Sequence, residues 1–151
     1  MQNSFDITLK NHKIFINILE ELTVDQLNKI PNGFRNNVYW NIKHVVVTQQ
    51  LLVYSLSEMP TQITSAEVEA YRKDTVPLKD ATKIDVDILK KQLLKTLEQT
   101  IEDYTAKNFK TYKEYTVATK TVLTNVEEAI EFNNFHEGVH LGYILALKRL
   151  I

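Results

Sequence analysis

The sequence predicts an all-α protein, a four-helix bundle with a crossover loop between its second and third long helices. The 151 residues include only three glycines and three prolines, too few for the many turns of a β-sandwich or barrel. Four long segments carry apolar residues at spacings of three and four, the period of a helix buried on one face. Hydrophobic residues make up 44% of the chain, enough for one core, so we expect a single domain over residues 1–151.

Composition excludes several classes of function. The net charge of −1 gives no electrostatic attraction for nucleic acid or for an anionic membrane. The absence of cysteine excludes disulfides, thiolate metal ligands and a cysteine nucleophile. No apolar run approaches the roughly 20 residues of a membrane span, and the first residues lack the pattern of a secretory signal. We therefore expect a cytoplasmic protein with no membrane association.

The first long helix is expected over residues 3–22, where apolar residues recur at helical spacing. His12 lies beside this apolar stripe, and we interpret it as a partly buried packing histidine. A capping box formed by Thr23 and Gln26 opens a short helix, which Pro31 closes.

The second long helix is expected over residues 38–56, with Asn37 as its N-cap. A histidine occupies the middle of its apolar stripe, and the only tryptophan lies one turn before it. The largest apolar side chain of the protein is therefore expected to cover one side of the imidazole. The stripe consists of Trp40, His44, Val47, Leu51 and Tyr54.

The middle of the chain connects the second long helix to the third. Residues 65–72 are expected to form a short helix, and residues 73–83 a loop that is either a binding wall or lid or a plain crossover. Asp85 is expected to open the third long helix, over residues 86–109, whose apolar seam contains no histidine. Residues 110–123 alternate poorly and are expected to be irregular, as a loop or a short extended pair.

The fourth long helix is expected over residues 126–151, opened by a capping box of Thr124 and Glu127. One stripe at spacings of three and four is apolar except in its middle, where two histidines stand one turn apart. Both imidazoles can therefore reach a single ion. The stripe consists of Ala129, Phe132, His136, His140, Tyr143, Leu147 and Ile151.

Together the second and fourth helices place three histidines, His44, His136 and His140, within apolar seams. Three buried imidazoles without partners are costly, and neutral imidazoles that share a divalent cation remove this cost. Three histidine ligands leave at least one coordination position open, the arrangement of a catalytic zinc site. The alternative is that the histidines are surface or core residues without a ligand.

The segment HEGVH also matches the HExxH pattern of metalloproteases. Only eleven residues follow His140, which leaves no place for the downstream third ligand of those enzymes. Glu137 lies about 100° around the helix from His136, so we expect it beside the metal, as a catalytic proton carrier, or in solvent. Asn133 precedes His136 by one turn and is expected, with Trp40, to form the wall of a ligand pocket; a structural polar contact is the alternative.

At these residues the sequence resembles the DinB/YfiT-like family of metal-dependent proteins. The likeness rests on the segments WNIKH at 40–44 and HEGVHLGYI at 136–144, and on the layout of four helices over nearly the whole chain. The resemblance implies an up-down-down-up bundle and a homodimer. It also implies a divalent metal, zinc or nickel, held by His44, His136 and His140.

Some members of that family are bacillithiol transferases or a mycothiol-dependent isomerase, in which the metal lowers the pKa of a low-molecular-weight thiol and holds the thiolate. The resemblance therefore implies a small-molecule substrate and a metal-dependent thiol S-transferase, or a related enzyme such as a hydrolase. A non-catalytic stress protein that binds a metal or ligand on the same bundle is the alternative. A third interpretation is a helical interaction module with incidental histidines. The family name refers to induction by DNA damage and does not imply DNA binding.

Overall fold

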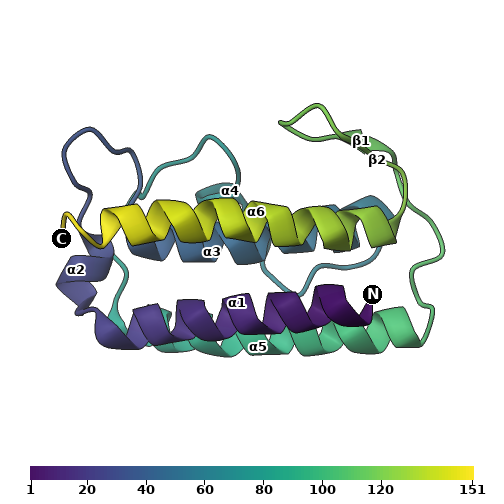
Figure 1. The fold of residues 1–151 in the computed structure, drawn as a ribbon, viewed down its shortest axis with the longest axis horizontal. Coiled ribbons are helices and arrows are strands. Elements are labelled where there is room, and N and C mark those ends of the chain that lie inside the picture. The colour runs from purple at the N-terminus through teal and green to yellow at the C-terminus, as the bar shows by residue number, and fades with distance from the viewer.

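The computed structural model describes residues 1–151 and confirms an all-α fold (Figure 1). Its only extended structure is a hairpin of two short strands. None of the helices combines the length and the apolar character that a membrane crossing requires. The elements in chain order are α1 (Gln2–Glu21), α2 (Val24–Asn28), α3 (Val38–Gln49), α4 (Ser65–Tyr71), α5 (Lys83–Thr105), β1 (Tyr115–Thr116), β2 (Val122–Leu123) and α6 (Val126–Leu147).

The four long helices form a ring in which α1 packs against α5 and α6, and α3 packs against the same two helices. Hydrogen bonds between α1 and α6 show that these helices run in the same direction. Thr8 bonds to Asn134 near one end, and Lys148 bonds to Glu21 near the other. Figure 1 shows α3 and α5 running the opposite way. The topology is therefore up-down-down-up, as the family resemblance implies.

Two consecutive helices that run in the same direction need a connection back along the bundle. Residues 58–82 provide it, and α4 within them packs against α3. A capping box opens α4, because the Thr64 side chain accepts from the backbone N–H of Glu67 and the Glu67 carboxylate accepts from Thr64. This crossover matters for the site because the carbonyl of Tyr71, at the end of α4, contacts a histidine of α3.

The core has two apolar clusters with a polar layer between them. One cluster gathers around Phe15, Leu93 and Ile144, and the other around Phe5 and Ile130 at the hairpin end. The layer between them contains buried polar side chains from all four long helices. Its members include Thr8, His12, Gln49, Thr96, Thr100, Asn133 and Glu137.

The last helix begins at Val126, as predicted, but its predicted cap is wrong by one residue. Asn125, rather than Thr124, is the N-cap of α6, because its side-chain oxygen accepts from the backbone N–H of Glu128. The Glu128 carboxylate in turn accepts from the backbone N–H and hydroxyl of Thr124. The helix also ends at Leu147, earlier than expected.

Other helix boundaries also differ from the prediction, and α5 ends at Thr105 rather than at residue 109. Helix α5 begins at Lys83 with Thr82 as its N-cap, and Asp85 is the third helical residue, which completes a capping box. Helix α3 is regular only to Gln49 and continues as a π-helical turn over Gln50–Tyr54. The π-turn keeps this stretch helical, so the expected length of the second long helix is nearly retained.

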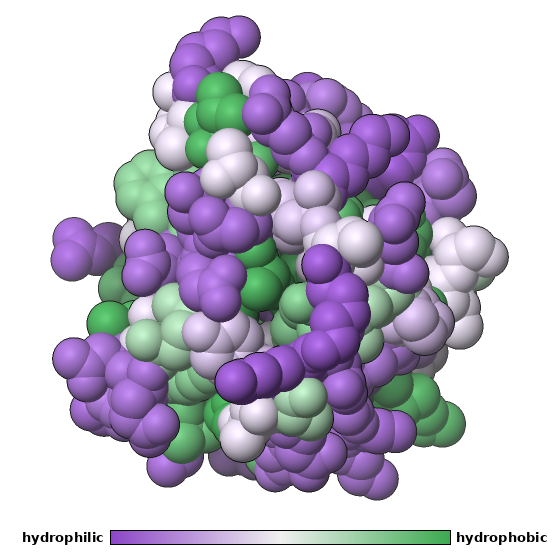
Figure 2. All heavy atoms as spheres, turned by 90° about the vertical axis from the view of Figure 1, so that its right-hand side faces the viewer, coloured by the Kyte–Doolittle hydropathy of each residue, from purple (hydrophilic) through white to green (hydrophobic).

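Part of the segment expected to be irregular, residues 110–123, forms the β1–β2 hairpin. Val117 and Leu123 are buried beneath it, in the second core cluster. Figure 2 shows this end of the molecule, where hydrophilic residues cover most of the face and apolar residues are visible between them. The hairpin is thus packed onto the bundle beside α6.

Candidate metal centre

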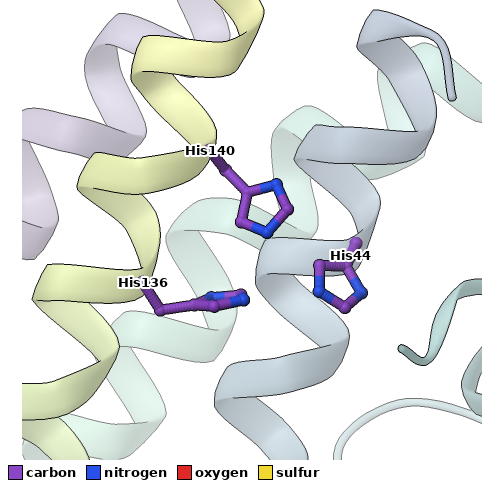
Figure 3. A group of neighbouring side chains, drawn as sticks. All are labelled: His44, His136 and His140. Atoms are coloured by element: carbon purple, nitrogen blue, oxygen red, sulfur yellow. The ribbon is translucent and has the colours of Figure 1, made fainter. Parts of the chain in front are cut away.

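The three histidines singled out from the sequence lie together between α3 and α6 (Figure 3). His44 comes from the middle of α3, and His136 and His140 come from successive turns of α6. One ring nitrogen of each lies within 4.8 Å of the others. The ring centroids are 4.5 to 5.2 Å apart, so a single ion between them can be reached by all three.

Neighbouring groups fix the orientation of His44. Its Nδ1 lies 2.7 Å from the carbonyl oxygen of Tyr71, so Nδ1–H donates and Nε2 carries the lone pair. The Trp40 ring stacks on the imidazole at 4.7 Å and 9°, and its own N–H donates to Thr75 of the crossover. The Thr48 hydroxyl lies 3.2 Å from Nε2 and can donate to its lone pair.

A side chain rather than a carbonyl orients His140. Its Nδ1 lies 2.9 Å from Oδ1 of Asn41, while the amide nitrogen of Asn41 donates to the carbonyl of Asn37. That second bond determines which way the Asn41 amide points, so His140 also presents Nε2 to the site. Hydrogen-bond partners of this kind hold metal-binding histidines in the tautomer that a metal requires.

His136 differs because its Nδ1 is buried and has no hydrogen-bond partner. A buried polar atom in this state costs about 1–3 kcal/mol. An ion bound by the ring would supply a polar partner that the protein does not. The unpartnered atom and the two oriented neighbours therefore fit a metal ligand set.

Burial keeps the three imidazoles neutral. It lowers the pKa of His136 to about 3, with the nearby His140 and His44 rings lowering it further. Burial, followed by the proximity of His44, lowers the pKa of His140 to about 4. The pKa of His44 is also lowered by burial, against the opposing effect of the Tyr71 carbonyl. Three neutral nitrogen ligands without a carboxylate suit zinc or nickel better than calcium or magnesium.

The histidines open into a cavity of about 580 Å³, within the size range of small-molecule sites. Trp40 lines it, as predicted. The hairpin also contributes to the wall, through Tyr115 and Val117. The sequence pattern did not indicate this role, although residues two apart in a strand point to the same face. The lining residues are Asn36, Trp40, Asn41, His44, Thr48, Leu51, Leu52, Ser55, Leu56, Lys73, Tyr115, Val117, Ala118, Phe132, His136, Val139, His140 and Tyr143.

Glu137 and Asn133 do not line the cavity into which the three histidines open. Glu137 is fully buried, so its expected position beside the metal or in solvent is wrong. Its carboxylate faces α1, at 3.0 Å from the Asn11 amide nitrogen and 3.1 Å from Nε2 of His12. Asn133 donates to the same carboxylate at 2.8 Å and does not line the cavity. His12 is the buried packing histidine that the sequence predicts, and its Nδ1 contacts the carbonyl of Leu93.

Comparison with known proteins identifies a family and a solved structure with a similar fold. Residues 9–144 match the family model described as the DinB superfamily. A conserved protein of Enterococcus faecalis, known from its crystal structure, has a similar fold with a TM-score of 0.68 and 14% sequence identity. That likeness covers 99% of this chain and 95% of the other. No curated protein sequence matches significantly.

Proposed function

The chain belongs to the DinB superfamily, and from that premise we propose that it is a metal-dependent enzyme that transfers a low-molecular-weight thiol to a small electrophile. One observation carries the proposal: three neutral histidines meet at the wall of a cavity large enough for a small molecule. Family membership and this cluster are both compatible with metal binding. Zinc and nickel are the metals that the ligand set favours.

A divalent ion held by three imidazoles would leave a position for a thiol and would lower its pKa, so that it binds as the thiolate. The reaction we propose forms a bond between the thiol sulfur and an electrophilic carbon. The bond from that carbon to its leaving group breaks, and the leaving group takes the electron pair. The thiol proton passes to solvent.

The residues around the histidines support this reaction by orientation and shielding. The Tyr71 carbonyl and the Asn41 amide hold His44 and His140 in the required tautomer. The Trp40 ring covers one face of His44 and limits its contact with water. The hydroxyl of Thr48 lies 3.2 Å from Nε2 of His44, so an ion bound to that nitrogen would free the hydroxyl to donate to an anionic group at the open position.

A second candidate is a non-catalytic protein that binds a metal or ligand on the same bundle. The position of Glu137 favours this candidate. Its carboxylate faces α1, and no other carboxylate lines the cavity, so none is available to carry protons between reactants. Thiol transfer does not require such a group, since the released proton can leave to solvent. The two candidates differ in turnover and not in metal content.

We also propose that the protein forms a homodimer through α6. Phe135, Val139 and Leu145 on this helix each expose about half of their surface. Apolar side chains exposed along one helix are typical of an interface with another protein surface. The neighbouring Gly138 and Gly142 have open space at their Cα atoms, so a second helix could approach closely.

The deciding experiment is metal analysis of untagged protein, with wild type beside His140→Ala. We expect about one divalent ion per chain in the wild type and none in the variant. Asn36→Ala is the matched control, because Asn36 lines the cavity without contacting a histidine, and it should retain the metal. Absence of metal from the wild type, even after reconstitution with zinc or nickel, would refute the proposal.

Turnover then separates the two candidates. Purified metal-loaded protein is assayed with several thiols and electrophiles beside a His44→Ala variant. Thiol-dependent turnover that disappears in the variant supports the enzyme. Tight metal binding without turnover on any pair favours the binding protein.

A further inference from the structure

The histidines divide the cavity into two ends of different chemistry. Helices α3 and α6 are antiparallel, so residues early in α3 face residues late in α6. The end near the start of α3 carries the amide of Asn36 and the ammonium of Lys73, whose loop neighbours Tyr71 and Thr75 contact His44 and Trp40. The opposite end is enclosed by Leu52, Leu56 and the hairpin residue Val117. A ligand that fills both ends needs a polar head and an apolar body.

The shape of the cavity favours an elongated ligand. Its wall follows α3 and its continuation from Asn36 to Leu56. At a rise of 1.5 Å per residue, this stretch is about 30 Å long, and its part between Trp40, which contacts the loop of Lys73, and Leu52 is about 18 Å long. The volume of about 580 Å³ is therefore distributed along the helix rather than gathered into a sphere around the histidines.

The charges of the wall favour an anion. No aspartate or glutamate is among the lining residues, and Lys73 is the one lysine or arginine. Lys73 forms no ion pair within the protein, unlike Lys10, Lys43 and Lys90. An ammonium group on a ligand would therefore find no carboxylate in the cavity, whereas a carboxylate would find a free lysine.

We propose that the electrophilic substrate of this site is an elongated apolar molecule with one anionic group, its head toward Lys73 and its body beneath the hairpin. This inference rests on the proposed function, because it names the class of the second substrate in the same cavity. The thiol would occupy the histidine centre between the two ends. Burial of the ligand body at the apolar end would strengthen binding, and Lys73 would favour a negatively charged head over a positively charged one.

Trp40 provides a direct measurement of occupancy. It is the only tryptophan, it lines the cavity and it stacks on His44, so its fluorescence reports on this site alone. Octanoate, octanol and octylammonium are titrated into zinc-loaded protein and into metal-free protein. We expect octanoate to bind most tightly and octylammonium most weakly. From butanoate to octanoate, each added methylene should tighten binding about fourfold.

Paired variants test the two ends separately. Lys73→Gln should weaken octanoate binding about threefold, as expected for an exposed lysine, and should leave octanol unchanged. The control Lys79→Gln removes a lysine from the same loop that does not line the cavity. Ala118→Glu places a carboxylate at the apolar end and should weaken both octanoate and octanol. Its control, Thr119→Glu, adds the same charge one residue beyond the wall.

Equal affinity for the three octyl compounds, or affinity independent of chain length, would overturn the inference. So would octylammonium binding more tightly than octanoate. If zinc binds at about one ion per chain but no octyl compound does, this inference falls and the proposed function stands. If octanoate binds to protein that takes up no metal, the ligand class is supported and the proposed enzyme is refuted.

Discussion

Glu67→Gln should destabilise the protein by about 3 kcal/mol. Glu67 belongs to α4 and forms an ion pair with Lys43 of α3, and Gln92 of α5 contacts both charged groups. The Lys43 side chain is only 4% exposed and that of Glu67 22%. The substitution keeps the shape of the side chain, but its single oxygen can accept either from Thr64 or from Lys43 and Gln92, so one of these hydrogen-bond sets is lost with the charge.

The magnitude follows from the ammonium group that remains. Removal of one partner of a buried ion pair costs about 3–5 kcal/mol, because the other charge stays buried without compensation. The partial exposure of Glu67 places the estimate at the lower limit of that range. For a chain of this length, about 3 kcal/mol corresponds to a fall of about 6–12 °C in Tm.

The effect should also depend on pH. Burial raises the pKa of Glu67, but hydrogen bonds from Gln92, Lys43 and the Thr64 amide outweigh it and lower that pKa to about 2. A carboxylate whose pKa is depressed on folding stabilises the protein above its unfolded pKa of about 4.5. The advantage of wild type over the variant should therefore be complete at pH 6 and should shrink as the pH falls from about 4.5 to about 2.

Thermal and urea unfolding followed by circular dichroism would measure this difference. Glu69→Gln is the matched control in the same helix, because its ion pair with Arg72 is exposed and should be worth less than about 1 kcal/mol. A double variant with Lys43→Met should recover much of the loss, since no charge is then left buried. The reasoning is refuted if Glu67→Gln and Glu69→Gln unfold at the same temperature.

Three further predictions concern the site and α6. Asn41→Ala should weaken zinc binding about 10- to 100-fold in chelator competition, because the partner that orients His140 is lost; an unchanged affinity would contradict this role. Glu137→Ala should cost about 3 kcal/mol or more in urea unfolding, since three buried side chains lose their hydrogen-bond partner, and the folded variant should bind zinc more weakly because the rotation of α6 is no longer fixed. Phe135→Asp should convert the proposed dimer into a monomer in sedimentation, and a dimer that persists would place the interface elsewhere.

Much of the site could be predicted from sequence because its histidines interrupt apolar seams. His44 follows Trp40 by one turn, and His136 and His140 share one helix face. Helical spacing therefore identifies the candidate ligands on each helix. Local periodicity also predicts the four long helices. Cap positions were less certain, because Thr124 and Asn125 are both good caps and only the folded backbone distinguishes them.

The orientation of Glu137 could not be obtained from helical spacing. Spacing gives the angle between two side chains but does not say which neighbouring helix each one faces. The buried face of α6 contains polar residues in its middle and therefore does not look like a core stripe; it consists of Val126, Ala129, Ile130, Asn133, Glu137, Ile144 and Leu147. The polar partners of this face lie on α1, more than a hundred residues away in sequence. The hairpin was equally hard to predict, because each strand has only two residues.

The buried carboxylate of Glu137 explains how the fold holds the metal site. Asn11 and His12 of α1 both form hydrogen bonds with it, so α6 cannot turn about its axis without leaving these groups unpaired inside the protein. His136 is the preceding residue and lies about 100° around the same helix. The contact that directs Glu137 toward α1 therefore holds His136 toward α3, where His44 stands. In the segment HEGVH the glutamate fixes the rotation of the helix, and that rotation brings both histidines to the site.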